Sequence, residues 1–245
     1  GLAEAFRSAY ADSWMGKAAI VLVVAAIGLG NAAYEAGNIT GAALGLQNIT
    51  GLGVSSWSVA VGLLAACLLA SGKYRLIEKL LIVLVLLMSA VFLLTLIMIK
   101  PSLTGLLSGL VVPRVPDGSL LMVIALIGTT VVPYNLFLQA SAVQEKWPCQ
   151  SDTTTALREA RIDTGLSIGL GGLITLVMST SAAAFFGSST EFSAANMAAQ
   201  LEPLLGSSAR YFFAAGLFAA GLSSAVTAPL AAAYAVCGAL GWPRD

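Results

Sequence analysis

The residues Gly128–Asn135, with the sequence GTTVVPYN, place oxygen-bearing and helix-breaking groups in the middle of an apolar segment long enough to cross a bilayer. Pro133 lacks a backbone N–H and clashes with the carbonyl four residues before it, and the preceding glycine and threonines weaken the helix further. The pattern predicts a helix that is broken near the middle of the membrane. Carbonyls freed by such a break, together with the Asn135 amide, are hard oxygen ligands that suit a cation. The alternative is an ordinary proline kink in which Asn135 bonds to a neighbouring helix.

Glu35 is the one acidic residue that lies deep within a predicted span. Burying a carboxylate at that depth costs at least roughly 2.5–3.5 kcal/mol, so Glu35 should face the bundle interior, take up a proton or find a partner. Asn31 and Asn38 lie four residues before it and three residues after it, on the same helical face. The three side chains predict the wall of a water or proton pathway. A structural hydrogen bond between helices is the alternative.

Three more residues of the segment around Asn135 are assigned to gating or packing. Pro133 produces the predicted break, and we expect Tyr134 to pack or to gate beside it. Gln139 lies one turn beyond Asn135 on the same face, so it extends the polar strip toward the cytoplasm.

The composition of the chain identifies a membrane protein and excludes several other classes. Of 245 residues, 58% are hydrophobic and only 10% are charged, with 12 basic and 12 acidic side chains. Too few charges are available to cover a soluble surface, and zero net charge without a basic run excludes disorder and nucleic-acid binding. Histidine is absent, so neither a Ser-His-Asp triad nor a histidine zinc site can form within this chain. We therefore expect neither an enzyme nor a bound cofactor.

The distribution of apolar runs predicts an all-α polytopic membrane protein with six transmembrane helices. Alternate connections carry nine and three basic residues, which places the richer side and both termini in the cytoplasm. The chain starts with Gly1 instead of Met and ends directly after a span, so we expect a fragment of a longer transporter. The glycines at 37, 41 and 45 have a spacing that suits close helix packing. We predict a single transmembrane domain over residues 1–245, with spans near 17–46, 56–72, 77–99, 119–144, 164–187 and 209–241.

The segment Gly128–Gln144 (GTTVVPYNLFLQASAVQ) resembles the sixth-helix signature of the natural-resistance-associated macrophage protein (NRAMP) family. Glu35–Leu46 (EAGNITGAALGL) looks like the third helix of that family, and Arg158–Thr164 (REARIDT) like the segment before its next span. The resemblance implies a secondary transporter of divalent metals such as manganese and iron, usually coupled to protons. It also implies helices three to eight of a LeuT-type inverted-repeat fold. The family's first helix, which supplies an Asp and an Asn to the metal, has no counterpart in this chain.

The chain departs from the pattern of the family at positions that touch its chemistry. The metal-binding methionine of the family falls at Val132, and the alanine that offers a carbonyl falls at Thr129. The histidine after the proline falls at Tyr134. Of the two acids in the third helix, the first falls at Glu35 and the second at Asn38. Loss of a soft thioether leaves oxygen donors, so the site should accept harder ions such as magnesium.

These residues together predict a proton-coupled symporter of divalent metal ions in the cytoplasmic membrane, with the lipid bilayer as its surroundings and no nucleic-acid partner. The predicted cation site consists of the Thr129 carbonyl, the Val132 position and Asn135. A second hypothesis is a magnesium or broad divalent-cation carrier without proton coupling. A third is a carrier of an organic substrate, whose carboxylate would meet the amide end of the broken helix. A fourth is a non-transporting membrane subunit or scaffold.

Overall fold

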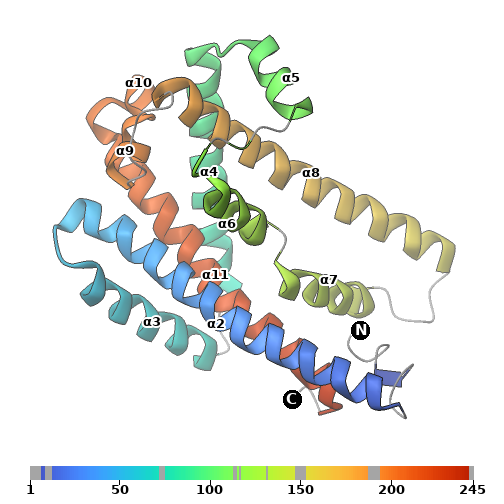
Figure 1. The fold of residues 1–245 in the computed structure, drawn as a ribbon. Helices are drawn as coiled ribbons and strands as arrows, with labels where there is room; N and C mark the ends of the chain where they lie inside the picture. The colour runs from blue at the N-terminus through green and yellow to red at the C-terminus, as the bar shows by residue number, and fades with distance from the viewer. Residues whose placement is uncertain are drawn as a thin grey trace. The chain divides into compact units, whose positions relative to one another are not determined.

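The computed structural model describes residues 7–8, 13–71, 75–112, 115, 117–130, 132–146, 153–186 and 194–242, and the regular structure of this part of the chain is entirely helical (Figure 1). The predicted all-α class is therefore confirmed. The helices are α2 (Trp14–Thr50), α3 (Val54–Ser71), α4 (Arg75–Ile99), α5 (Leu103–Val111), α6 (Leu120–Thr130), α7 (Pro133–Lys146), α8 (Thr153–Phe186), α9 (Ala194–Ala199), α10 (Glu202–Leu205), the 3-10 turn η1 (Gly206–Ser208) and α11 (Ala209–Leu240).

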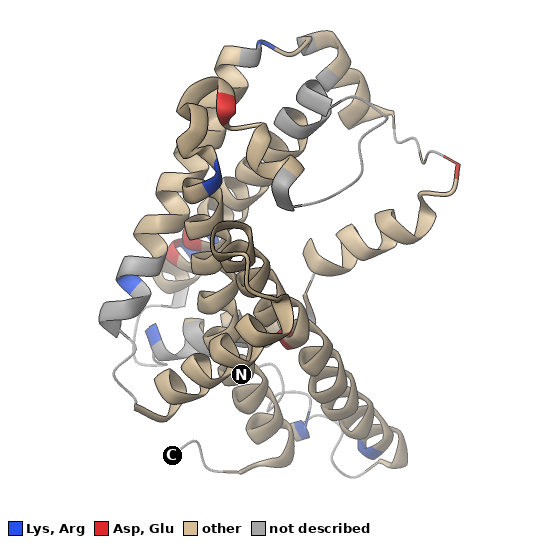
Figure 2. Cartoon of the chain, turned by 90° about the vertical axis from the view of Figure 1, so that its left-hand side faces the viewer, with Lys and Arg blue, Asp and Glu red and all other residues tan. Residues whose placement is uncertain are grey.

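Five stretches of the described residues are long and apolar enough to cross a membrane, one fewer than the six predicted. They are Trp14–Thr50, Val54–Ser71, Leu120–Phe137, Thr154–Thr180 and Glu202–Leu240. The remaining predicted span corresponds to α4, whose described apolar run is Ile82–Met98. Figure 2 shows long helical stretches without a charged residue, as a lipid-facing surface requires.

The surface of the helices carries large apolar side chains. Leu22, Leu29, Leu121 and Ile168 are each more than two-thirds exposed. Water would disfavour so much contiguous apolar surface, whereas acyl chains accept it without cost. The exposure pattern fits helices that face lipid.

The described residues group into two compact units, which are considered separately. Unit 1 comprises Gly1–Ala36, Pro116–Gly165 and Thr227–Asp245, so it contains the first part of α2, all of α6 and α7, the start of α8 and the end of α11. Unit 2 comprises Gly37–Val115 and Leu166–Val226.

Unit 2 has two apolar cores that are built largely from small and aliphatic side chains. The first core joins α2, α3 and α11 through residues such as Ala42, Val61 and Leu222. The second joins α4, α8, α9 and α11, with Phe92 and Leu201 almost completely buried. Neither α9 nor α10, nor the short helix α5, was predicted, because segments of 4 to 9 residues carry too little periodicity to be recognised.

Candidate functional site

The predicted break in the helix is present: α6 ends at Thr130 and α7 begins at Pro133 (Figure 1). Pro133 explains both the end of α6 and the start of α7. It disfavours the helical conformation for the residue before it, so α6 cannot continue through Val132. As the first residue of α7, it loses nothing by lacking an N–H, because that donor has no partner inside a helix. The prediction of a broken helix is confirmed.

Some polar groups at the break form hydrogen bonds within the protein, and others are exposed. The hydroxyls of Thr129 and Thr130 both donate to the carbonyl oxygen of Leu126, at 2.9 and 2.8 Å. The backbone N–H of Asn135 donates to the carbonyl oxygen of Val132 at 3.1 Å. The Asn135 side chain is exposed, whereas the side chain of Val132 is only 8% exposed and offers no donor atom. The Asn135 amide is thus exposed at the break, and Thr129 is among the last four residues of α6, whose carbonyls have no partner inside the helix.

Within unit 1, Tyr34 joins α2 to this break. Its hydroxyl donates to the carbonyl oxygen of Gly128 at 2.8 Å. Gly128 is among the last four residues of α6, whose carbonyls have no partner inside the helix. The rings of Tyr34 and Tyr134 meet edge to face, with centroids 6.0 Å apart and planes at 76°. Tyr134 therefore packs against α2, which fits the packing role assigned to it.

The predicted pathway residues lie along α2. Asn31 is 7% exposed, and its Oδ1 atom has no hydrogen-bond partner among the described residues. Glu35 is half-buried. Asn38 is also half-buried and belongs to unit 2, whereas the other two belong to unit 1. A buried amide oxygen without a donor is the kind of group that an internal water satisfies.

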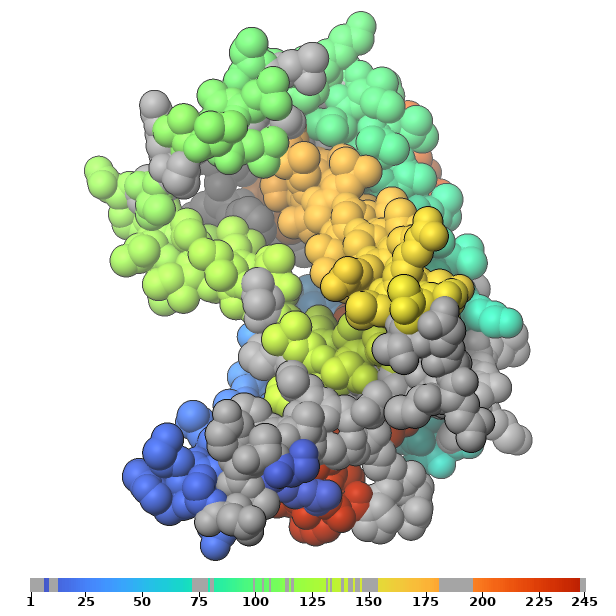
Figure 3. All heavy atoms as spheres, turned by 90° about the vertical axis from the view of Figure 1, so that its right-hand side faces the viewer, coloured from blue at the N-terminus to red at the C-terminus, as the bar shows by residue number. Residues whose placement is uncertain are grey.

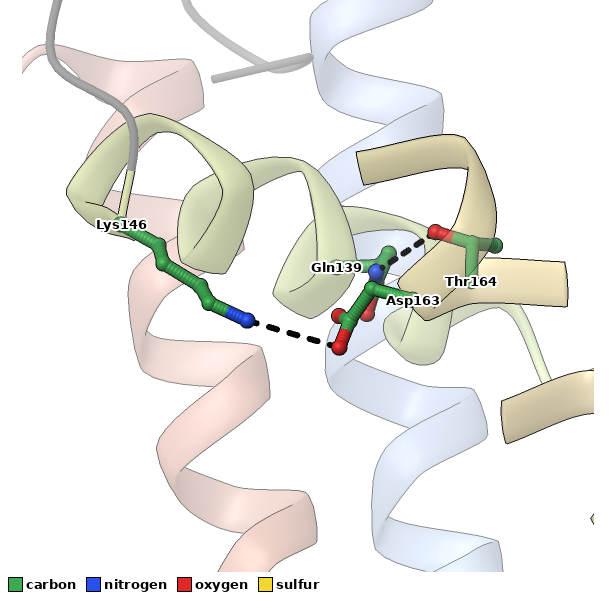
Figure 4. A network of polar contacts seen from close by, with 4 residues as sticks. All are labelled: Gln139, Lys146, Asp163 and Thr164. Atoms are coloured by element: carbon green, nitrogen blue, oxygen red, sulfur yellow. Dashed lines mark hydrogen bonds and ion pairs between the residues drawn. The ribbon is translucent and has the colours of Figure 1, made fainter. Parts of the chain in front are cut away.

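Two contacts tie α7 to the start of α8 (Figure 4). Gln139 Nε2 donates to Thr164 Oγ1 at 3.0 Å, and Lys146 Nζ lies 3.4 Å from Asp163 Oδ1. Figure 3 shows the atoms of α7 and of the first turns of α8 side by side. The segment that resembles the sixth helix of the family thus contacts the segment Arg158–Thr164. The hydrogen bond of Gln139 is one of the two contacts.

The one participant that the sequence reasoning missed is Tyr34. A phenol within an apolar helix normally finds a hydrogen-bond partner, and Tyr34 directly precedes Glu35. The sequence therefore indicated that Tyr34 would form a hydrogen bond. It did not indicate that Gly128 would be the acceptor, because Gly128 lies 94 residues away along the chain.

The donor chemistry of the break is that of neutral oxygen atoms. Among the described residues, no three His, Cys, Asp or Glu side chains gather in a group that could hold a metal ion. A cation at the break would meet a carbonyl and an amide, which are ligands of hard ions.

The comparisons with known proteins agree on one family. The whole chain, residues 1–245, matches the family described as natural resistance-associated macrophage protein-like. The chain is 31% identical to the divalent metal cation transporter MntH of Deinococcus radiodurans. The compared region has 219 residues, which is 86% of this chain and 50% of that protein. Proteins of the same name from Chromohalobacter salexigens and Pectobacterium carotovorum are 29% and 28% identical, each over 81% of this chain. The chain spans about half the length of the curated relatives it matches.

Proposed function

This chain belongs to the natural resistance-associated macrophage protein-like family, and we therefore propose that it forms part of a secondary transporter for divalent metal cations. The names of its relatives support this proposal, since each is a divalent metal cation transporter. The observation that carries it is the interruption between α6 and α7, because broken helices near the midplane form the ion sites of many secondary transporters. The protein is accordingly a carrier and not an enzyme.

The proposed cation site lies at the interruption. The Thr129 carbonyl and the Asn135 amide supply oxygen ligands, and Val132 occupies the position between them. The exposed side chain of Asn135 supports this role, since a ligand must be reachable by its ion. In this proposal the cation is manganese or iron, as in the family to which the sequence is similar, and it is a substrate instead of a resident cofactor.

A proton or water pathway is proposed along α2 beside the cation site. Glu35 carries the proton, while Asn31 and Asn38 hold water along the same helical face. Support comes from the Oδ1 atom of Asn31, which is buried and has no hydrogen-bond partner among the described residues. Tyr134 gates this region, and Pro133 and Gln139 keep α7 in place.

The proposed architecture is a single transmembrane domain over residues 1–245 within a longer protein of the cytoplasmic membrane. It has six spanning helices that form part of a LeuT-type inverted-repeat fold. Both termini face the cytoplasm, as the distribution of basic residues indicates. Alternating access exposes the cation to one side of the membrane at a time.

A second candidate is a carrier of magnesium or of a broad range of divalent cations without proton coupling. The burial of an inert Val132 at the break favours it, because no soft ligand is present at that position to select manganese over magnesium. The presence of Asn38 where the resemblance implies an acid removes one proton acceptor.

Flux into proteoliposomes that contain the full-length protein tests both candidates. Manganese and magnesium uptake are measured separately, with a pH-sensitive dye inside the vesicles. Asn135→Ala removes the proposed ligand, Asn135→Asp keeps an oxygen at that position, and Thr175→Ala removes an exposed hydroxyl that donates within α8. We expect Asn135→Ala to abolish uptake while the other two variants retain it.

The results separate the candidates. Manganese uptake with internal acidification and without magnesium uptake supports the proton-coupled carrier. Magnesium uptake at constant pH supports the second candidate. Absence of flux for both metals contradicts both, and leaves the carrier of an organic substrate and the non-transporting subunit or scaffold.

A further inference from the structure

A polar cavity of about 450 Å³ lies in unit 2. It is formed where the end of α2 meets α9, α10, η1 and the start of α11. In Figure 1 the short helices α9 and α10 lie beside the first turns of α11. The cavity is lined by Asn48, Ala198, Ala199, Glu202, Ser207 and Arg210.

The cavity contains both signs of charge. Glu202 and Arg210 line it together, yet no ion pair joins their side chains in the described part of the chain. The Arg210 guanidinium is held by Tyr211: its Nη2 donates to the tyrosine hydroxyl at 2.7 Å, and Cζ lies 4.7 Å from the ring centroid. The Nδ2 atom of Asn48 is buried and meets no acceptor among the described residues. The cavity is therefore complementary to a zwitterionic group, in which a positive charge would face Glu202 and anionic oxygen atoms would face Arg210 and Asn48.

An apolar groove of about 180 Å³ lies beside Tyr211, the residue that holds the Arg210 guanidinium of the polar cavity. It lies between α4 and α11, and Tyr211 lines it next to Arg210 of the polar cavity. A Cβ at Gly216 would collide with the thioether of Met88, so glycine is what allows these two helices to come close there. The helix α10, which carries Glu202, also packs against α4. The groove is lined by Leu84, Leu87, Met88, Tyr211, Phe212, Ala215 and Gly216.

We propose that unit 2 binds an aminophospholipid, whose head group occupies the polar cavity and whose acyl chain occupies the groove. The phosphate meets Arg210, which forms short charge-assisted bonds to phosphate oxygens, and Asn48 donates to another oxygen. The primary ammonium of phosphatidylethanolamine donates to Glu202. Phosphatidylcholine has no N–H to donate, and phosphatidylglycerol has no cation for the carboxylate. The site therefore discriminates among lipids by head group.

Lipid retention on the purified protein tests this site. The full-length protein is solubilised from vesicles with equal amounts of the three phospholipids, and the retained lipids are quantified by mass spectrometry. Arg210→Gln and Glu202→Gln remove the two charges, and Ala215→Phe fills the exposed groove. The matched controls are Arg158→Gln and Ala66→Phe, which change exposed residues outside both sites.

We expect phosphatidylethanolamine to be enriched on the protein and on both controls. Arg210→Gln should lower the retention of phosphatidylethanolamine by about two- to fivefold, since partly exposed ion pairs contribute up to about 1 kcal/mol. Ala215→Phe should also lower its retention. Glu202→Gln should remove the preference for phosphatidylethanolamine over phosphatidylglycerol. Melting curves that match those of the controls show that the variants fold.

Equal retention of the three lipids, or retention in all variants at the level of the unchanged protein, would overturn the proposal. Complete displacement of the lipid by dissolved phosphoethanolamine would also overturn it, because the groove would then contribute nothing. The assay needs no metal flux, so its outcome is independent of the transport proposal.

Discussion

The hydroxyl of Tyr34 donates a 2.8 Å hydrogen bond to the carbonyl oxygen of Gly128, so α2 caps the end of α6 directly before the helix breaks. A carbonyl capped in this way is less available to a cation, which favours the carbonyl of the next residue, Thr129, as the ligand proposed for the ion. The contact also places the ring of Tyr34 against that of Tyr134, at the start of α7. One side chain of α2 thus contacts both sides of the interruption.

Replacing Tyr34 with Phe should lower the stability of the protein by about 1 kcal/mol, because it removes the donor to Gly128 but keeps the ring contact. For a chain of this size that corresponds to a fall of about 2–4 °C in melting temperature. Thermal unfolding in detergent measures it. Tyr134→Phe is the control, since it leaves the bond to Gly128 intact. Equal melting temperatures for the two variants would show that the bond contributes nothing.

Replacing Val132 with Met should raise manganese uptake relative to magnesium uptake by about tenfold, equal to about 1.4 kcal/mol of preference. A thioether is a soft ligand, and it would enter the break where an inert side chain now lies. Competition between the two metals in the proteoliposome assay measures the ratio. Val132→Leu adds similar volume without sulfur, so a matching change in that variant would assign the effect to packing.

Of the two contacts between α7 and α8, the hydrogen bond should matter more than the ion pair. Thr164→Val leaves the half-buried amide of Gln139 unpaired, at a cost of about 1–2 kcal/mol. Asp163→Asn should cost less than about 1 kcal/mol, because the side chains of Lys146 and Asp163 are 59% and 48% exposed. Denaturation in detergent compares the variants. A larger loss in Asp163→Asn would reverse this order of importance.

Two glycines one turn apart on α2 should respond oppositely to alanine. A Cβ at Gly45 would lie 2.8 Å from the backbone carbonyl oxygen of Ala214, so Gly45→Ala should destabilise unit 2 by about 1–3 kcal/mol. A Cβ at Gly41 meets nothing within 4 Å among the described residues, and Gly41→Ala should be neutral or stabilise the helix by up to about 1 kcal/mol. Melting temperatures of the two variants test this, and similar values would contradict it.

The features that could be predicted well from the sequence are those with a local cause. The break before Pro133 follows from the geometry of one ring and its neighbours, so it could be placed to within a residue or two. The single long helix through Glu35 follows from a mostly apolar run that contains no proline. The count of six spans was not confirmed: five described stretches are long and apolar enough to cross a membrane, and the described apolar run of α4 covers Ile82–Met98.

The helical class, the apolar surface and the interruption before Pro133 could all be derived from residue types, since each depends on neighbours within one or two turns. The tertiary contacts could not: Tyr34 caps Gly128, Gln139 meets Thr164, and Gly45 is a site of close packing while Gly41 is not. Glycines 41 and 45 look identical in a helical pattern, and their difference comes entirely from what the neighbouring helix brings to each. The partners in these contacts lie between 25 and 169 residues apart along the chain, and periodicity within one helix carries no information on which segment will lie opposite it.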